Sequence, residues 1–385
     1  MKRLTFEADH DQFRDSVRAF MLKEVAPHRD RFRKEGIVDR ALFTKAGELG
    51  FLCTWADPAF GGAGVDDFRF EQIIIEENIR HGDSGFYINL HNDLVAPYIA
   101  KLGTEAQKQR FMPGIVSGQT ILAVAMTEPS TGSDLAGMKS TARRDGDDWI
   151  LNGAKTYISN GILSDLVVVA AKSDPENPRA MSLFLIERGM PGFERGQKLA
   201  KMGLKSQDTS ELFFSDVRIP ATNVLGEPGK AFSYLTHFLA QERLVAAIGF
   251  IAAAQTAFDL TLDYVIERKA FGRPIGAFQN TRFKMAQMRA EIDAIQTFVD
   301  QCVLLLNAGT LSGVEASSAK LLTSELEGRV LDECVQLHGG AGYMDEYRIS
   351  RMYTDARVSR IYAGTSEIMR EIIGRSLGLD ERTLK

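Results

Sequence analysis

The sequence predicts an α+β protein made of three consecutive parts: helical, then rich in β-strands, then helical again. Apolar residues recur at helical spacing towards both ends of the chain, and short β-rich runs separated by turn residues fill the middle. This order is not the alternation of strands and helices that gives a Rossmann fold. We therefore expect a helical domain over residues 1–118, a β-domain over 119–226 and a helical domain over 227–385.

Helical spacing defines three segments of the first part. Phe13, Val17 and Phe20 form one apolar stripe with charges between them, and residues 70–79 form a second. Residues 105–112 are expected to form a third helix. We expect Pro113 to end it, because proline cannot continue the backbone hydrogen bonding of a helix.

The middle part contains six short runs with the composition of strands, at residues 120–126, 149–151, 156–158, 166–170, 181–186 and 212–214. Asp145-Gly146-Asp147-Asp148 and Asn152-Gly153 are typical of hairpin turns. The spacing predicts an antiparallel β-domain. After it, four helices are expected over residues 231–268, 281–307, 314–337 and 366–377.

Composition excludes several classes of partner. The chain has 385 residues and a net charge of −5, whereas nucleic-acid-binding proteins usually carry a basic excess, so no nucleic acid is expected. The three cysteines are far apart, and neither they nor the histidines have the spacing of a metal site.

Neither a membrane span nor a targeting segment is expected. The longest uncharged, mostly apolar run, residues 244–258, is too short to cross a bilayer. The N-terminal residues have no signal or transit character. We expect a cytoplasmic location, or the mitochondrial matrix if a presequence was removed.

Four polar segments are candidates for binding anionic groups, and each has a purely structural alternative. Residues 127–134 are rich in small hydroxyl residues and glycine and expose backbone N–H groups, or simply connect two strands. Residues 336–343 contain consecutive glycines, which suit an anion or a helix C-cap. Residues 268–273 carry three cations, which suit phosphate or a solvated helix end. In residues 360–368, Thr365 or Ser366 can cap the last helix.

A fifth segment contains Glu242 and Arg243 at the start of a strongly apolar helical stretch. Adjacent helical positions point about 100° apart, so the two charges need not neutralise each other. A carboxylate that faces an apolar cavity has a raised pKa, which suits a general base near neutral pH. The alternative is a glutamate that faces solvent at a domain edge.

Taken together and in this order, the five segments resemble the acyl-CoA dehydrogenase family, and the resemblance covers residues 13–377. It implies the acyl-CoA dehydrogenase fold, with an N-terminal helical domain, a middle antiparallel β-domain and a C-terminal four-helix bundle. It also implies FAD as cofactor, an acyl-CoA substrate and a homotetramer built as a dimer of dimers.

The resemblance implies specific ligands for FAD and substrate. The flavin would lie against residues of two segments, with further contacts to its phosphates and adenosine, some from a neighbouring subunit. These cofactor residues are Val124, Met126, Thr127, Gly132, Ser133, Tyr157, Ile158, Ser159, Arg268, Gln279, Gln336, Leu337, His338, Gly339, Gly340, Thr365, Ser366 and Glu367. The substrate contacts would be Ser133, Tyr234, Gln241, Arg243, Ala363 and Gly364.

The catalytic base differs between subgroups of the family. Many members carry a glutamate directly before the Gly-Thr of the C-terminal loop, where this chain has Ala363. The long-chain and isovaleryl subgroups place the base on an earlier helix before an arginine, which matches Glu242-Arg243. Residues 241–244, 201–205 and 364–369 look closest to the long-chain enzyme.

The implied reaction is the α,β-dehydrogenation of a fatty acyl-CoA to the trans-2-enoyl-CoA, as in fatty acid β-oxidation. Glu242 would remove the α-proton while the β-hydrogen passes as hydride to flavin N5, and the Ala363 N–H would support the thioester oxygen. An electron-transferring flavoprotein is the expected electron acceptor.

The sequence leaves open the length and branching of the acyl chain, and whether CoA or a carrier protein bears it. Phe86 and Tyr87 are bulky and fall in the region that bounds the acyl tail in this family. Medium-to-long straight chains are expected first. Short or branched chains, acyl groups on carrier proteins, and a flavin acyl-CoA oxidase are the alternatives. A catalytically inactive binding module would follow if Glu242 pointed to solvent.

Overall fold

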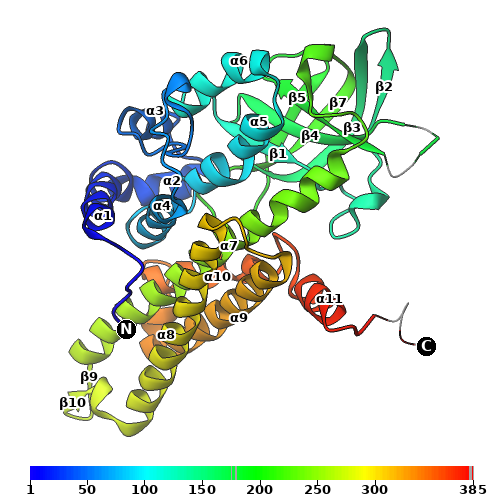
Figure 1. Ribbon diagram of the computed structural model, residues 1–385. Coiled ribbons are helices and arrows are strands. Elements are labelled where there is room, and N and C mark those ends of the chain that lie inside the picture. Colours follow the sequence, from blue (N-terminus) through cyan, green and yellow to red (C-terminus); the bar gives the residue numbers. More distant parts are fainter. Residues whose placement is uncertain (175, 178–179, 381–383, 385) are drawn as a thin grey trace.

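The computed structural model describes residues 1–174, 176–177, 180–380 and 384, and it has the predicted α+β architecture. In Figure 1 the N-terminal helices and the sheet lie side by side at the top, and the long helices of the C-terminal part extend below them. Helix α7 connects the two regions, since its first turns pack beside the sheet and its last turns reach the far end of the bundle.

The N-terminal part consists of helices packed around an aromatic core. Its α-helices are α1 (Ala8–Phe20), α2 (Arg29–Glu35), α3 (Ala41–Glu48), α4 (Phe68–His81), α5 (Ala96–Leu102) and α6 (Glu105–Val116). π-Helical turns occupy Met21–Val25 and Leu90–Val95. The prediction that Pro113 ends the third helix is wrong, because α6 continues for another turn in which Ile115 and Val116 are buried.

The middle part is a twisted sheet with the strand order β6-β7-β3-β2-β4-β5-β8, and β1 pairs with β4. The strands are β1 (Leu122–Ala125), β2 (Thr141–Asp145), β3 (Asp148–Ser159), β4 (Leu166–Lys172), β5 (Met181–Glu187), β6 (Phe193–Lys198), β7 (Thr209–Ile219) and β8 (Val224–Leu225). Most pairs are antiparallel, as predicted, but β1 runs parallel to β4 and β2 has one parallel pairing with β4. The sheet is therefore mixed.

One predicted hairpin turn is present and the other is not. Residues 145–148 join the antiparallel strands β2 and β3, and Gly146 has a φ of 66°. Asn152-Gly153 instead lies inside the single strand β3, at a shift in its register with β7. Gly153 is required there because a Cβ would approach the Ser140 hydroxyl oxygen to 2.3 Å.

The C-terminal part contains α7 (Ala231–Glu267), α8 (Gln279–Asn307), α9 (Gly313–His338), α10 (Arg348–Ala356) and α11 (Ser366–Ser376). A hairpin of β9 (Lys269–Ala270) and β10 (Arg273–Pro274) joins α7 to α8. The sequence did not predict α10, which shares one buried core with α7, α8 and α9. Contacts of Arg243 with Ser317 and of Tyr264 with His338 show that α7 and α9 run in the same direction.

Helix α7 is long and apolar enough to cross a membrane by length and composition, with a mean hydropathy of 1.6 in its most apolar window. Packing accounts for that composition, because 67% of the window is buried against the other parts of the protein.

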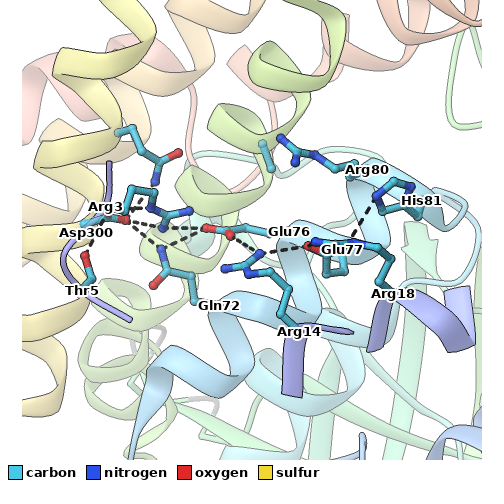
Figure 2. Close-up of polar contacts among 12 residues, drawn as sticks. Arg3, Thr5, Arg14, Arg18, Gln72, Glu76, Glu77, Arg80, His81 and Asp300 are labelled. Carbon is cyan, nitrogen blue, oxygen red and sulfur yellow. Dashed lines mark hydrogen bonds and ion pairs between the residues drawn. The ribbon is translucent and has the colours of Figure 1, made fainter. Parts of the chain in front are cut away.

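A charge network fixes the N-terminal segment to two distant helices (Figure 2). Arg3 binds Glu76 of α4 at 2.8 Å and Asp300 of α8 at 2.5 Å. Arg14 also binds Glu76, at 2.8 Å, and Arg18 binds the neighbouring Glu77 at 3.0 Å. The network therefore ties the N-terminal segment to α4 and α8 through buried carboxylates.

Candidate active site

The Glu242 carboxyl is buried on α7, with only 9% of the residue exposed. Burial raises its pKa from 4.5 to about 7, against the opposing effects of a hydrogen bond from Tyr98 and the charge of Arg243. Glu242 does not face solvent, and near neutral pH it exchanges a proton readily. These are the properties that a general base requires.

Tyr98 of α5 holds the Glu242 carboxyl in place. Its hydroxyl donates to Glu242 Oε1 at 2.7 Å, and its ring lies 4.3 Å from that of Phe238. Tyr98 itself is almost fully buried, and burial together with the charge of Glu242 raises its pKa. A neutral phenol that donates to a carboxylate orients the base without removing its charge.

Arg243 points in a different direction from Glu242. Its Nη1 donates to the Ser317 hydroxyl of α9 at 3.2 Å, and burial lowers its pKa. Gln241 donates through Nε2 to the Asp93 carbonyl at 2.9 Å, so it ties α7 to the π-helical turn that precedes α5. The Tyr234 hydroxyl accepts from the Glu227 N–H at 3.1 Å.

The loop before α11 is strained and held by α9. Ala363 has a φ of 53°, which is unfavourable for a residue with a Cβ, and Gly364 has a φ of 89°. Lys320, which is fully buried, donates to the Gly364 carbonyl at 2.6 Å. Thr365 caps α11, as predicted, by accepting from the Ile368 N–H at 3.3 Å.

The hydroxyl-rich loop after β1 is fixed by a buried ion pair at its base. Lys155 of β3 binds Glu128 at 2.8 Å and also donates to the Met126 carbonyl at 3.1 Å. Glu128 accepts further hydrogen bonds from the Lys139 and Ser140 N–H groups. Beyond this anchor, Gly132 and Ser133 are exposed.

The ends of β1 and β3 lie beside that loop. The Thr156 N–H donates to the Thr127 carbonyl at 3.0 Å, so Met126 and Thr127 lie next to the segment from Tyr157 to Ser159. Tyr157 has a φ of 60° and is 69% exposed, whereas Ile158 is buried in the sheet. Val124 packs at the edge of the adjoining core.

A second group of predicted cofactor residues lies at the other end of the bundle. Arg268 and Gln279 are exposed at the end of α7 and the start of α8. His338 stacks on Tyr264 of α7 with ring centroids 4.2 Å apart, which brings the segment from Gln336 to Gly340 to the same end. At 1.5 Å per residue, Arg268 is about 39 Å from Glu242 along α7. One chain does not bring the two groups together.

A cavity of about 170 Å³ lies between α4, α7 and α10. Val245 and Ala246 line it one turn beyond Glu242 on α7, and Gly249 lines it two turns beyond. All three lie on the same face of the helix as Glu242. Tyr87 and Tyr362 also line it. Burial raises the pKa of Tyr87 to about 12, and the charge of the nearby Glu242 contributes to that rise.

Phe86 and Tyr87 differ in their orientation. Phe86 is fully buried among Phe20 and Phe43 in the core of the N-terminal part, so it does not narrow the cavity. Tyr87 lines the cavity and Phe86 does not.

Sequence reasoning missed Tyr98, Lys155 and Lys320. Each is buried and contacts a predicted site segment from a part of the chain far away in sequence. A lysine within a strand or an apolar helix is an unusual residue to bury, and this was the only available signal for Lys155 and Lys320.

Comparison with known proteins decides the family. Residues 7–119, 123–217 and 229–378 match the family models of the acyl-CoA dehydrogenase N-terminal, middle and C-terminal domains. The chain belongs to the acyl-CoA dehydrogenase family. It is 47% identical to the mitochondrial long-chain specific acyl-CoA dehydrogenase of Sus scrofa over 98% of this chain and 89% of that protein.

Solved structures of the family agree with this assignment. An acyl-CoA dehydrogenase from Geobacillus kaustophilus has a TM-score of 0.96 and 49% identity, over 98% of this chain and all of that chain. A glutaryl-CoA dehydrogenase from Mycobacterium smegmatis in complex with FADH2 has a TM-score of 0.90 and 30% identity, over 97% and 95% of the two chains.

Family membership establishes the class of reaction. Acyl-CoA dehydrogenases are FAD flavoproteins that oxidise a CH–CH bond, and the chain is such an oxidoreductase with a role in fatty acid oxidation. The exposed Gly132-Ser133 backbone and the exposed Tyr157 ring suit a phosphate and a flat aromatic group, so the residues present fit FAD.

Proposed function

We propose that Glu242 is the base that removes the α-proton of a fatty acyl-CoA. The observation that carries the proposal is a buried carboxyl with a pKa of about 7, held by the Tyr98 hydroxyl at 2.7 Å. With such a pKa, both the deprotonated and the protonated form of the carboxyl are populated at neutral pH. Ala363 cannot take this role, because its side chain has no proton acceptor.

The strained Ala363 is proposed to support the thioester oxygen through its backbone N–H. Among the hydrogen bonds of the described residues, none uses this N–H as donor, so it is available to a substrate carbonyl. A backbone donor does not depend on the side chain, so the base can sit elsewhere while the oxyanion support stays in place. Lys320 holds the loop in this conformation through the Gly364 carbonyl.

FAD is proposed to bind the surface formed by two segments of one chain, where it would supply the acceptor for the hydride that leaves the β-carbon. The contacting residues of these segments would be Val124, Met126, Thr127, Gly132, Ser133, Tyr157, Ile158 and Ser159. The distal residues Arg268, Gln279 and 336–340, together with residues 365–367, would bind its phosphates and adenosine.

The separation of the two groups along α7 supports an oligomer. Since Arg268 lies about 39 Å from Glu242, one FAD molecule cannot contact both ends of the same helix. A neighbouring subunit would supply the distal residues, in the homotetramer that the family resemblance implies. An exposed Phe271 at the same end, 95% exposed, is consistent with burial in such a contact.

Medium-to-long acyl-CoA thioesters are the proposed substrates. The cavity next to Tyr87 and the small residues Ala246 and Gly249 provide room for an acyl chain beyond the reacting carbons. The similarity to a protein named for long-chain acyl-CoA supports the same choice. An electron-transferring flavoprotein is the proposed acceptor, and a cytoplasmic location stays a prediction, since the relatives include both mitochondrial and bacterial proteins.

Anaerobic bleaching of the flavin by a panel of acyl-CoA thioesters tests the proposal. We expect rapid bleaching by medium and long straight chains in the wild type. Glu242→Gln should keep its flavin and lose about two to four orders of magnitude in bleaching rate, the usual contribution of a general base. A Glu242→Gln protein that bleaches at the normal rate would contradict the base assignment.

The same panel separates the alternatives. Rapid hydrogen peroxide formation in air would indicate an oxidase. Bleaching only by acyl groups on a carrier protein would indicate a carrier-dependent enzyme. A preference for branched over straight thioesters would contradict the proposed chain type.

A further inference from the structure

Two buried cations lie behind the loop that contains Ala363. Lys320 of α9 is fully buried, and its Nζ donates to the Gly364 carbonyl at 2.6 Å. Arg243 of α7 is only 7% exposed, and its Nη1 donates to the Ser317 hydroxyl at 3.2 Å. Within 4.0 Å of either cation, the described residues provide no carboxylate oxygen. Both side chains therefore keep an unpaired charge away from solvent.

The two cations lie on one side of the bundle, together with the proposed base. Ser317 and Lys320 are three residues apart on α9, so they point to the same face of that helix. This face contacts α7 through Ser317 and the loop before α11 through Lys320. Glu242 directly precedes Arg243, and the charge of Arg243 acts both on Glu242 and on Lys320. The three charged groups are therefore within electrostatic reach of one another.

The carboxyls around Lys320 compensate its charge only weakly. Among the described residues, Glu325 and Glu327 of α9 and Glu367 of α11 act on it. Glu325 already binds two arginines, at 3.3 and 3.7 Å. Burial raises the pKa of Glu327 well above its usual range, so this group is neutral. The Glu367 side chain is 78% exposed, so solvent screens its charge.

The proposed reaction creates a negative charge next to this cation. When Glu242 takes the α-proton, the electron pair left on the α-carbon is shared with the thioester oxygen, which becomes negative. That oxygen would accept from the Ala363 N–H, and Ala363 directly precedes Gly364, whose carbonyl Lys320 contacts. A fixed cation near the place where negative charge develops stabilises the charged state, and more so in a buried site than in water.

We propose that the charge of Lys320 stabilises the negative charge that forms on the thioester oxygen, and so makes the α-proton of the bound substrate more acidic. Arg243 contributes to the same field from α7. The α-proton passes to Glu242, and Lys320 keeps its own proton throughout. The inference rests on the proposed function, because it assigns the electrostatic support of that reaction.

A structural role alone is the competing explanation for Lys320. Its hydrogen bond to the Gly364 carbonyl would then serve only to hold the loop. The two roles separate when Lys320 loses its proton, because the neutral amine can still donate this hydrogen bond but carries no charge. A structural role predicts that this deprotonation leaves the rate of the reaction unchanged. Charge stabilisation predicts a slower reaction.

The first test is the pH dependence of flavin bleaching in the holoenzyme with a saturating acyl-CoA. Burial lowers the pKa of Lys320 to about 8, and the charge of Arg243 adds to this effect. The bleaching rate should rise through about pH 7 as Glu242 deprotonates, and fall again above about pH 8 as Lys320 loses its charge. Lys320→Arg should move this fall to higher pH, since a guanidinium stays charged.

Lys201→Arg is the matched control for the first test. Lys201 lies in the connection between β6 and β7, outside the proposed site. It also donates to a backbone carbonyl, that of Gln207, and burial also lowers its pKa. In this variant the fall of the bleaching rate above about pH 8 should stay in place.

The second test measures the acidity of a bound substrate analogue. A thioester with sulfur in place of its β-methylene has no β-hydrogen to lose as hydride, and its bound enolate gives a charge-transfer absorbance with the oxidised flavin. Titration of this absorbance reports the pH at which the enolate forms. In Lys320→Met that pH should be about one unit or more higher than in the wild type, as expected when one nearby opposite charge is removed. In Lys320→Arg it should change little.

The possible failures are distinguishable. The inference is overturned if the fall above about pH 8 is absent from the wild type or unchanged in Lys320→Arg. It is also overturned if the enolate forms at the same pH in flavin-saturated Lys320→Met and in the wild type. If one of the two variants does not fold, the other still decides the question. No bleaching of the wild type by any thioester would instead contradict the proposed function.

Discussion

At the scale of single residues, the proposed chemistry depends on how the protein sets the pKa of one carboxyl. Burial raises the pKa of Glu242, and the Tyr98 hydroxyl opposes that rise by stabilising the charged form. The base must be deprotonated to accept the α-proton, so the rate of the chemical step should increase with pH through about 7.

Tyr98→Phe should move this pH dependence to higher pH. A hydrogen bond to a charged group contributes about 1.5–3 kcal/mol, and 1.36 kcal/mol corresponds to one pH unit, so the rising limb should shift by about one unit or more. The measurement is the rate of flavin bleaching as a function of pH. Tyr98 acts through Glu242, so the rate at high pH should approach that of the wild type. A uniform loss at every pH would instead indicate a structural role.

Glu242 should also make the folded state less stable at alkaline pH. The folded-state pKa is raised from 4.5 to about 7, so the folded protein holds a proton that the unfolded chain has released. The contribution of Glu242 is therefore most favourable below pH 4.5, and it is lost as pH rises to about 7, by up to about 3 kcal/mol at 1.36 kcal/mol per pH unit.

Glu242→Gln removes this titration and should stabilise the protein at pH 8 relative to the wild type. The amide carries no charge to desolvate and can still accept from Tyr98. At pH 5 the two proteins should have similar stability. Unfolding midpoints of wild type and variant at the two pH values measure the effect, and a wild-type advantage at pH 8 would contradict the proposed cause of the raised pKa.

At the scale of secondary-structure elements, the sequence predicted regular features well and tertiary contacts poorly. Helices α7, α8, α9 and α11 begin and end within two residues of the predicted bounds, because their apolar periodicity is long. The shorter α10 was missed. Local sequence preferences predict a helix end at Pro113 and a hairpin turn at Asn152-Gly153, and both predictions are wrong. The last turn of α6 is buried and continues past Pro113, and Gly153 lies inside a strand where Ser140 approaches it closely.

The same limit applies to the candidate site. Glu242 and the loops beside it could be selected from sequence, since each has a distinctive local composition. Tyr98 lies 144 residues from Glu242 and is recognisable only when α5 and α7 are packed together. Lys320 and Lys155 likewise acquire a role only through contacts that the chain makes after folding.

The buried pair of Lys155 and Glu128 illustrates how one element positions another. Lys155→Met should lower the free energy of unfolding by about 3–5 kcal/mol, because it leaves the Glu128 carboxylate buried without a cation. The loop over residues 127–134 should then lose its anchor, and the purified protein should contain less flavin. Absorbance of bound flavin and thermal unfolding measure the two effects.

The double variant Lys155→Met with Glu128→Gln is the control for that prediction. A neutral glutamine removes the unpaired charge and can still accept from the Lys139 and Ser140 N–H groups. Stability should recover in large part. If the double variant is no more stable than Lys155→Met, the loss comes from packing and not from the charge.

At the scale of the whole molecule, α7 separates two groups of proposed cofactor residues. Its first half carries Glu242, beside the sheet and the Ala363 loop, and its last turn leads to Arg268 at the far end of the bundle (Figure 1). The network of Arg3, Glu76 and Asp300 fastens the N-terminal part to this bundle. Each active site would then combine the Glu242 end of α7 from one chain with the Arg268 end of α7 from another chain.

Mixed oligomers test this arrangement. Arg268→Glu should abolish activity by repelling the FAD phosphates, and Glu242→Gln should abolish it by removing the base. When the two variants are co-expressed, a hybrid dimer would pair an intact Glu242 half with an intact Arg268 half at one of its sites. Activity should return to about a quarter of the wild-type rate, because random pairing makes half of the dimers hybrid and each has one complete site.

The activity of the hybrid dimers shows whether an active site is built from two chains or from one, because these two arrangements predict opposite outcomes. If each chain built its whole site alone, every chain in the mixture would carry one defect and no activity would return. A mixture of separately purified variants that do not exchange subunits is the control and should stay inactive. If Arg268→Glu is fully active without any second variant, the proposed contact between Arg268 and FAD is wrong. In that case the exposed Phe271 and its neighbours would also have no role in the proposed site.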